Sequence, residues 1–151
     1  MSFWNSLKNN VSSLSSNLQT QVSKFKNNDF ANASMAVCAL IAAADGSIDP
    51  AEKQKTAGFI MSSDVLKVFN ASELKQKFDG YCQKLEADID FGRVEVIQAI
   101  SKLRGKPDQA RAVIQVGVII GGADGHFDEL ERKALREACN AVGISPSEFD
   151  L

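Results

Sequence analysis

Residues 45–52 read Asp45-Gly46-Ser47-Ile48-Asp49-Pro50-Ala51-Glu52, and the same pattern returns further along the chain as Asp124-Gly125-His126-Phe127-Asp128-Glu129-Leu130-Glu131. Both stretches read D-G-x-[I/F]-D-x-x-E, and their acids stay in register, because 124 − 45, 128 − 49 and 131 − 52 all equal 79. An apolar run rich in small residues precedes each stretch, at 37–44 and at 116–123. Self-similarity at a fixed spacing indicates two copies of one structural unit.

The two acidic stretches carry the signals of helix starts. Asp49 is predicted to be the N-cap of a helix that has Pro50 at its first position and Glu52 as the partner in a capping box. Asp128 and Glu131 repeat this pattern for a last long helix that ends at Gly143. Gly46 and Gly125 are predicted to be the left-handed C-caps of the preceding helices.

The rest of the chain predicts further helices with short connections, and no segment alternates apolar and polar residues as a strand does. These helices span 35–44, 72–86 with Ser72 as N-cap, 90–104 and 108–123, and Ser145 is expected to cap a final turn. The run 35–44 is apolar nearly all round and should therefore be buried on every side. The predicted fold class is all-α, a compact bundle of seven or eight helices built from two pseudo-symmetric helical-hairpin repeats.

Residues 1–28 differ from the rest and are predicted to form a basic amphipathic arm, with residues 29–151 as a single helical domain. Apolar residues recur there at spacings of three and four from Trp4 to Phe25, which places them on one face of a helix. Two interpretations stay open. The face contacts a partner or, weakly, an anionic membrane surface, or it covers part of its own domain.

Composition excludes several classes of protein. A net charge of −2, with no basic stripe, argues against nucleic-acid binding. There is no signal-peptide pattern and no apolar run long enough for a membrane span, so a cytoplasmic protein is expected.

Cys38, Cys82 and Cys139 form no C-x-x-C pair and are expected to be reduced and buried. The chain also lacks a phosphate loop, a nucleophile elbow and the H-E-x-x-H motif, which predicts a non-enzyme.

Helix capping accounts for part of the acidic repeat. It leaves Asp45 and Asp124 unexplained, because both are predicted at the C-terminal, negative end of a helix, where a carboxylate is disfavoured. An Asx-turn is one explanation. The other is a divalent cation such as Ca²⁺ or Mg²⁺, since hard cations take carboxylate oxygens. The spacing is not that of an EF-hand, where the glycine stands at position six of the loop. His126 is expected to be a solvated loop residue, with ligation of a softer metal as the alternative.

On the residues 44–52 and 122–131, and on the apolar helices before them, the chain resembles the TerB family of bacterial tellurite-resistance proteins, over nearly its whole length. The resemblance implies an all-helical cytoplasmic protein that takes part in resistance to tellurite and in stress, phage or colicin resistance. It also implies metal binding through the acidic motif, and work with the membrane protein TerC and with calcium-binding TerD-like proteins, at the inner face of the membrane. Carried over by position, the candidate metal ligands are Asp45, Asp49, Glu52, Asp124, Asp128 and Glu131.

Three functional hypotheses follow. In the first, the paired acidic loops bind a divalent cation or the basic surface of a partner. In the second, the protein is a helical interaction scaffold that works with a membrane partner, and the acids are helix caps only. In the third, tellurium species react at the cysteines.

Overall fold

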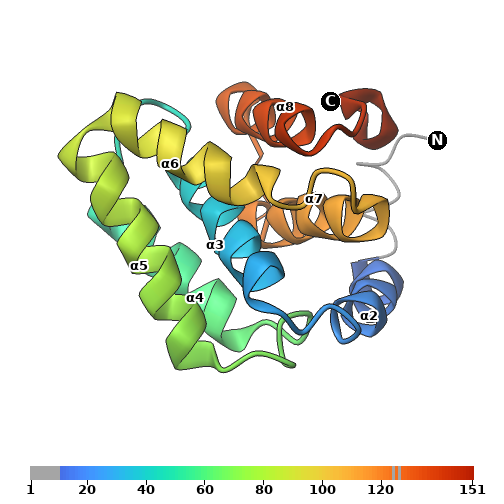
Figure 1. Cartoon of the computed structure of the whole chain (residues 1–151). Helices are drawn as coiled ribbons and strands as arrows, with labels where there is room; N and C mark the ends of the chain where they lie inside the picture. Colours follow the sequence, from blue (N-terminus) through green and yellow to red (C-terminus); the bar gives the residue numbers. More distant parts are fainter. Residues whose placement is uncertain (1–10, 124, 126) are drawn as a thin grey trace.

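The computed structural model describes residues 11–123, 125 and 127–151, and every regular element in this part of the chain is helical (Figure 1). The all-α prediction is confirmed. The described elements are α2 (Val11–Val22), α3 (Asn28–Ala42), α4 (Pro50–Ser62), α5 (Ala71–Ala87), α6 (Ile89–Ser101), α7 (Pro107–Gly121), α8 (Glu129–Val142) and the 3₁₀ helix η1 (Pro146–Phe149).

Helix α3 forms the centre of the molecule. It packs against α4, α5, α6, α7 and α8, and Figure 1 shows α5 on one side of it and α7 on the other. Every residue from Ala33 to Ile41 that carries an apolar side chain is buried, while Ala42 and Ala44 are partly exposed, so the prediction of all-round burial for 35–44 is confirmed except at these two residues. Burial of a continuous apolar surface of this kind is the main favourable contribution to the free energy of folding.

The repeat is visible in the bounds of the helices. Helix α7 begins and ends 79 residues after α3, since 107 − 28 and 121 − 42 both equal 79. Helix α8 begins 79 residues after α4 (129 − 50), and α6 ends 79 residues after α2 (101 − 22). Each repeat therefore contains three helices, α2–α3–α4 and α6–α7–α8, one more than the predicted hairpin.

The contacts between the repeats are reciprocal. Helix α3 packs against α6 and α8 of the second repeat, and α7 packs against α2 and α4 of the first. Helices α3 and α7 also pack against each other. Exchanging the two repeats thus reproduces these contacts, as a pseudo-twofold arrangement requires, although α6 also packs against α8 and the equivalent pair α2 and α4 shows no comparable contact among the described residues.

Helix α2 belongs to this arrangement, because it packs against α7 as α6 packs against α3. Its Leu18 and Val22 are buried, and Phe25 after it lies against the core. This part of the predicted apolar face covers the domain itself. Trp4 lies outside the described residues, and a domain boundary at residue 28 stays a prediction.

Several predicted helix ends were wrong. The N-cap of α5 is Asn70, whose side chain accepts a hydrogen bond from the Glu73 amide at 3.1 Å, so Ser72 lies inside the helix. Helix α6 begins after Asp88, which caps it, and ends at Ser101. Ser145 makes no side-chain cap hydrogen bond, and the turn after it is a 3₁₀ helix. Ser, Asn and Asp are all good caps, and their order in the sequence alone does not decide between neighbours.

Candidate functional site

The two acidic loops begin with the same turn. The Gly46 amide donates to the Ala43 carbonyl at 2.9 Å, and the Gly125 amide donates to the Gly122 carbonyl at 2.9 Å. Both glycines have positive φ, +94° and +82° respectively, a conformation that favours glycine. The C-caps themselves are Ala43 and Gly122, so the prediction that these glycines cap the helices was wrong.

Asp45 has a local structural role. Its carboxylate accepts a hydrogen bond from the Ser47 amide at 3.1 Å, which is an Asx-turn. Asp45 was predicted to lie at the C-terminal end of the preceding helix. Helix α3 ends at Ala42, however, so Asp45 lies beyond its last turn. The conflict with the helix dipole is therefore smaller than expected, because that effect falls off within the last turn. Its repeat counterpart Asp124, like His126, lies outside the described residues.

Asp49 and Asp128 are helix N-caps, as predicted. The Asp49 carboxylate accepts from the Ala51 amide at 2.8 Å, and the Asp128 carboxylate accepts from the Glu131 amide at 2.9 Å. In α8 the Glu131 carboxylate also accepts from the Asp128 amide at 3.1 Å, which completes a capping box. Within the described chain, Glu52 makes no such bond to the Asp49 amide, so the prediction of a capping box in α4 was wrong.

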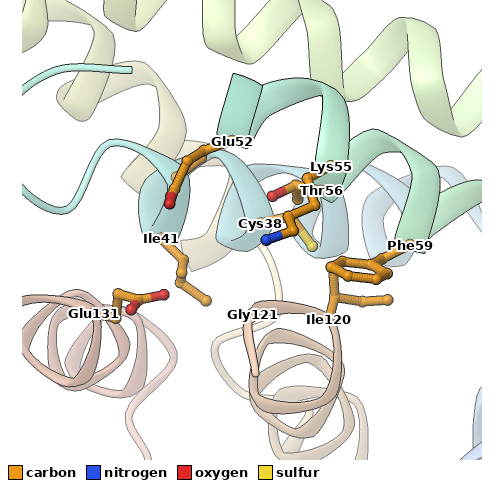
Figure 2. A pocket seen from close by; sticks show the side chains of 10 residues that line it. Cys38, Ile41, Glu52, Lys55, Thr56, Phe59, Ile120, Gly121 and Glu131 are labelled. Atoms are coloured by element: carbon orange, nitrogen blue, oxygen red, sulfur yellow. The ribbon is translucent and has the colours of Figure 1, made fainter. Parts of the chain in front are cut away.

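Glu52 and Glu131, which occupy equivalent positions of the two repeats, line one small pocket of about 30 Å³. Figure 2 shows Glu52 reaching in from α4 and Glu131 from α8. The remaining lining is largely apolar and includes Ile41, Phe59 and Ile120, and Lys55 also borders the space. The volume is about that of one water molecule.

Glu52 and Glu131 are the two acids among the described residues that line this pocket, and carboxylates are the ligands that hard cations prefer. Mg²⁺ in particular is commonly held by one or two carboxylates and keeps several of its waters. Of the other predicted ligands, Asp45, Asp49 and Asp128 do not line the pocket. No group of three or more acidic, histidine or cysteine side chains within the described residues is arranged to hold a metal ion. The described part of the site is therefore a two-carboxylate site.

The cysteines are free and buried, as predicted. Cys38 lines the pocket. Burial raises the pKa of its thiol to about 12, and burial likewise raises the pKa of Cys82 and of Cys139 to about 12. A thiol with so high a pKa stays protonated near neutral pH and is a poor nucleophile and metal ligand. This disfavours thiolate chemistry and softer metals at the pocket.

Comparison with known proteins identifies the family of this chain. The sequence profile of the family described as "Tellurite resistance protein TerB" matches residues 31–151. A "Tellurium resistance protein TerB" from Alcaligenes sp. is 35% identical over 118 residues, which cover 78% of this chain and 97% of that protein. The chain belongs to the TerB family. No solved structure matches it.

Membership of the TerB family makes this a tellurite-resistance protein, as the resemblance of the acidic repeats implied. The matched range includes both acidic loops and every helix from α4 onward, and it begins inside α3. No helix among the described residues is long and apolar enough to cross a bilayer.

Sequence reasoning did not identify Lys55 and Phe59, which line the pocket beside Glu52. Both follow Glu52 in α4, at spacings of three and seven, and side chains at those spacings share one face of a helix. That spacing was the signal that could have placed them beside Glu52. It did not identify the opposite wall, which comes from α3, α7 and α8.

Proposed function

We propose that this TerB-family protein acts in tellurite resistance as a non-enzymatic binding protein whose paired acidic loops bind a divalent cation, Ca²⁺ or Mg²⁺. The observation that supports the proposal best is that Glu52 and Glu131 line the same pocket. Two like charges brought close together either raise each other's pKa or attract a cation. A bound cation would join α4 of one repeat to α8 of the other.

The turn and cap contacts would support such a site. Asp45 holds its loop in an Asx-turn, and Asp49 and Asp128 fix the starts of the two helices that carry the glutamates. Ligands held by such contacts need less ordering when the cation binds. Asp124 is proposed as a further ligand from the second loop. A basic side chain on the surface of a partner could pair with the same carboxylates in place of the ion.

The expected partners remain proposals. We propose a TerC-like membrane protein and other tellurite-resistance proteins as partners, and a site of action in the cytoplasm at the inner face of the membrane. No nucleic acid is proposed, because the net charge is −2.

Titration with Ca²⁺ and Mg²⁺, followed by backbone NMR and calorimetry, tests the cation proposal. We expect shifts that cluster at residues 44–52 and 123–131, and we expect Glu52→Gln and Glu131→Gln each to weaken binding at least tenfold. Glutamine at the third helical position can still complete a capping box, so Glu131→Gln should keep its stability.

Glu73→Gln is the matched control. Glu73 is also an acid in the first turn of a helix, three residues after the N-cap Asn70, but it does not line the pocket. The cation proposal fails if millimolar Ca²⁺ and Mg²⁺ leave the loop shifts unchanged. It also fails if Glu73→Gln weakens binding as much as the two pocket substitutions do.

A second candidate function is a helical interaction scaffold in which the acids serve as caps only. Two observations favour it. Asp45, Asp49 and Asp128 all have a turn or cap role. In addition, an open groove of about 560 Å³ runs between α4 and α5, and its lining includes Met61, which is 48% exposed.

Two substitutions test the scaffold with a co-expressed TerC-like protein as the bait. Met61→Asn replaces Met61 by asparagine, the residue type at the equivalent position of the second repeat, Asn140. This substitution should weaken capture if the groove is the docking surface. Deletion of residues 1–10 keeps the buried Leu18 and Val22, and should weaken capture if the N-terminal face is the docking surface. If both variants are captured like the wild type, the scaffold proposal loses its support.

A further inference from the structure

The pocket between the acidic loops lies on the seam where the two repeats meet. Six of its lining residues form pairs that are 79 positions apart, namely Ile41 and Ile120, Ala42 and Gly121, and Glu52 and Glu131. Residues related in this way line one space only if that space lies close to the axis that relates the repeats. The two repeats therefore contribute matching walls and matching carboxylates.

One charged residue breaks this match. Lys55 lines the pocket from α4, one helical turn after Glu52. Its counterpart 79 positions later is Ala134 in α8, which is buried at 4% exposure and carries no charge. Figure 2 shows the Lys55 nitrogen directed into the space that Glu52 and Glu131 border. The pocket thus contains two carboxylates and one ammonium group.

We infer that Lys55 is the built-in counter-ion of this pocket and that it competes with a divalent cation for Glu52 and Glu131. The inference rests on the proposed function, because it assigns a regulatory residue to the same site. An ammonium group on a long, flexible stem can offset one charge of a carboxylate pair as a point charge. It can also swing away, because Lys55 is exposed to solvent. Lys55 therefore offsets one of the two negative charges of the pocket and raises the cation concentration that is needed for binding.

The expected size of this effect follows from Coulomb's law. A single charge acting on a divalent ion across about 5 Å of water-like medium changes its binding by roughly tenfold. Salt screens such an interaction between exposed groups, so the effect should shrink at high ionic strength. A merely structural role for Lys55 would show no such dependence on salt.

The test is calorimetric titration of Lys55→Gln with Ca²⁺ and Mg²⁺ at low and high salt. We expect roughly tenfold tighter binding at low salt and a smaller gain at high salt. Lys55→Arg keeps the charge and should bind as the wild type does. Lys53→Gln is the matched control: it removes the same charge from the same helix, but Lys53 faces α5, where it pairs with Glu86 at 2.9 Å.

The outcomes separate this inference from the proposed function. If the wild type binds the cation and Lys55→Gln binds no more tightly than Lys53→Gln, the counter-ion role is wrong while the cation site stands. If Lys55→Gln binds and the wild type does not, the proposed function of the wild-type protein fails, and only the competition of Lys55 with a cation is supported. If neither protein binds at millimolar Ca²⁺ or Mg²⁺, both the proposed cation site and the proposed competition of Lys55 with the cation are wrong.

Discussion

The two repeats share their helix positions but bury their surfaces differently. In α4 of the first repeat only Ala57 and Ile60 are buried, whereas in α8 of the second repeat Ala134, Leu135, Ala138, Cys139 and Val142 are buried. The first repeat is followed by the long helix α5, and the second by the short 3₁₀ helix η1. The second repeat is thus anchored chiefly by the inner face of its own last helix, and the first repeat relies on an additional helix.

Polar contacts at equivalent positions show the same division. Asn32 of α3 accepts from Lys77 of α5, while its counterpart Arg111 of α7 pairs with Glu148 of η1. On the last helix of each repeat, Lys53 pairs with Glu86 of α5, and the counterpart Arg132 donates to the Asp150 carbonyl. The C-terminal segment therefore takes over, with few residues, contacts that α5 makes in the first repeat.

The difference also explains why the acidic motifs diverge in use. α8 begins with a complete capping box, so part of the Glu131 carboxylate serves the helix start. α4 has Asp49 and Pro50 at its start, and the described chain shows no capping bond from the Glu52 side chain. Both glutamates of the motif therefore line the pocket, and Glu131 also caps its helix.

The largest expected contrast between the repeats is in the core. Leu135→Ala removes a fully buried side chain from α8 and should lower the free energy of unfolding by about 2–5 kcal/mol. Thr56→Ala, at the equivalent and only partly buried position of α4, should cost less than about 1 kcal/mol. Urea denaturation of both variants measures this. Equal losses would show that α4 and α8 contribute equally to the core.

The contact between α3 and α7 gives the next largest effect. A Cβ atom added at Gly117 would lie 2.5 Å from a methyl carbon of Val37 on α3, so Gly117→Ala should destabilise the fold by about 1–3 kcal/mol. Gly58 of α4 has open space around the added atom, and Gly58→Ala should stabilise the fold by up to about 1 kcal/mol. Thermal unfolding of the two variants should shift the midpoint in opposite directions. A higher midpoint for both variants would mean that helix propensity outweighs the crowding between the repeats.

The helix starts should differ by a smaller amount. Asp128→Ala disrupts a complete capping box and should cost about 1–2 kcal/mol, while Asp49→Ala should cost about 0.5–1 kcal/mol because Pro50 already fixes the first helical residue. Asp→Asn at either position keeps an acceptor and should cost little. Urea denaturation measures these losses. If Asp49→Ala costs more than Asp128→Ala, the two starts are not stabilised as the hydrogen bonds indicate.

Much of this architecture was predictable from the repeat. The 79-residue spacing placed both loops and the starts of α4 and α8, because Asp at an N-cap is a local signal that needs no tertiary contact. The apolar run before Asp45 likewise predicted the buried centre of α3. These features depend on residues close together in the chain.

The remaining features depend on contacts between distant residues. The convergence of Glu52 and Glu131 follows from the packing of α3 on α7, which no local pattern sets. The role of α2 stayed open between two interpretations for the same reason: its Leu18 and Val22 gave the pattern of an amphipathic helix, and only the contact with α7 shows that this part of the face covers the domain itself. The choice of Glu131 but not Glu52 for a capping box was also beyond the motif, since both satisfy it equally.

The smallest expected contrast concerns pH. The hydrogen bond from Arg111 lowers the pKa of Glu148, so this pair stabilises the fold above the ordinary pKa of a glutamate, and the contribution disappears as the pH falls through the lowered value. The equivalent contact of the first repeat, Asn32 with Lys77, joins an amide to an ammonium group, and neither kind of group titrates between pH 3 and 7.

Urea midpoints at pH 7 and pH 3 compare these two contacts. Glu148→Gln should lower the midpoint at pH 7 and match the wild type at pH 3, while Asn32→Ala should lower it by the same amount at both. Glu148 is exposed and salt screens such pairs, so the difference at pH 7 should be small and should shrink further in high salt. A loss for Glu148→Gln that persists at pH 3 would mean that Glu148 supports η1 by packing rather than by charge, and the C-terminal segment would then resemble α5 more closely than its ion pair indicates.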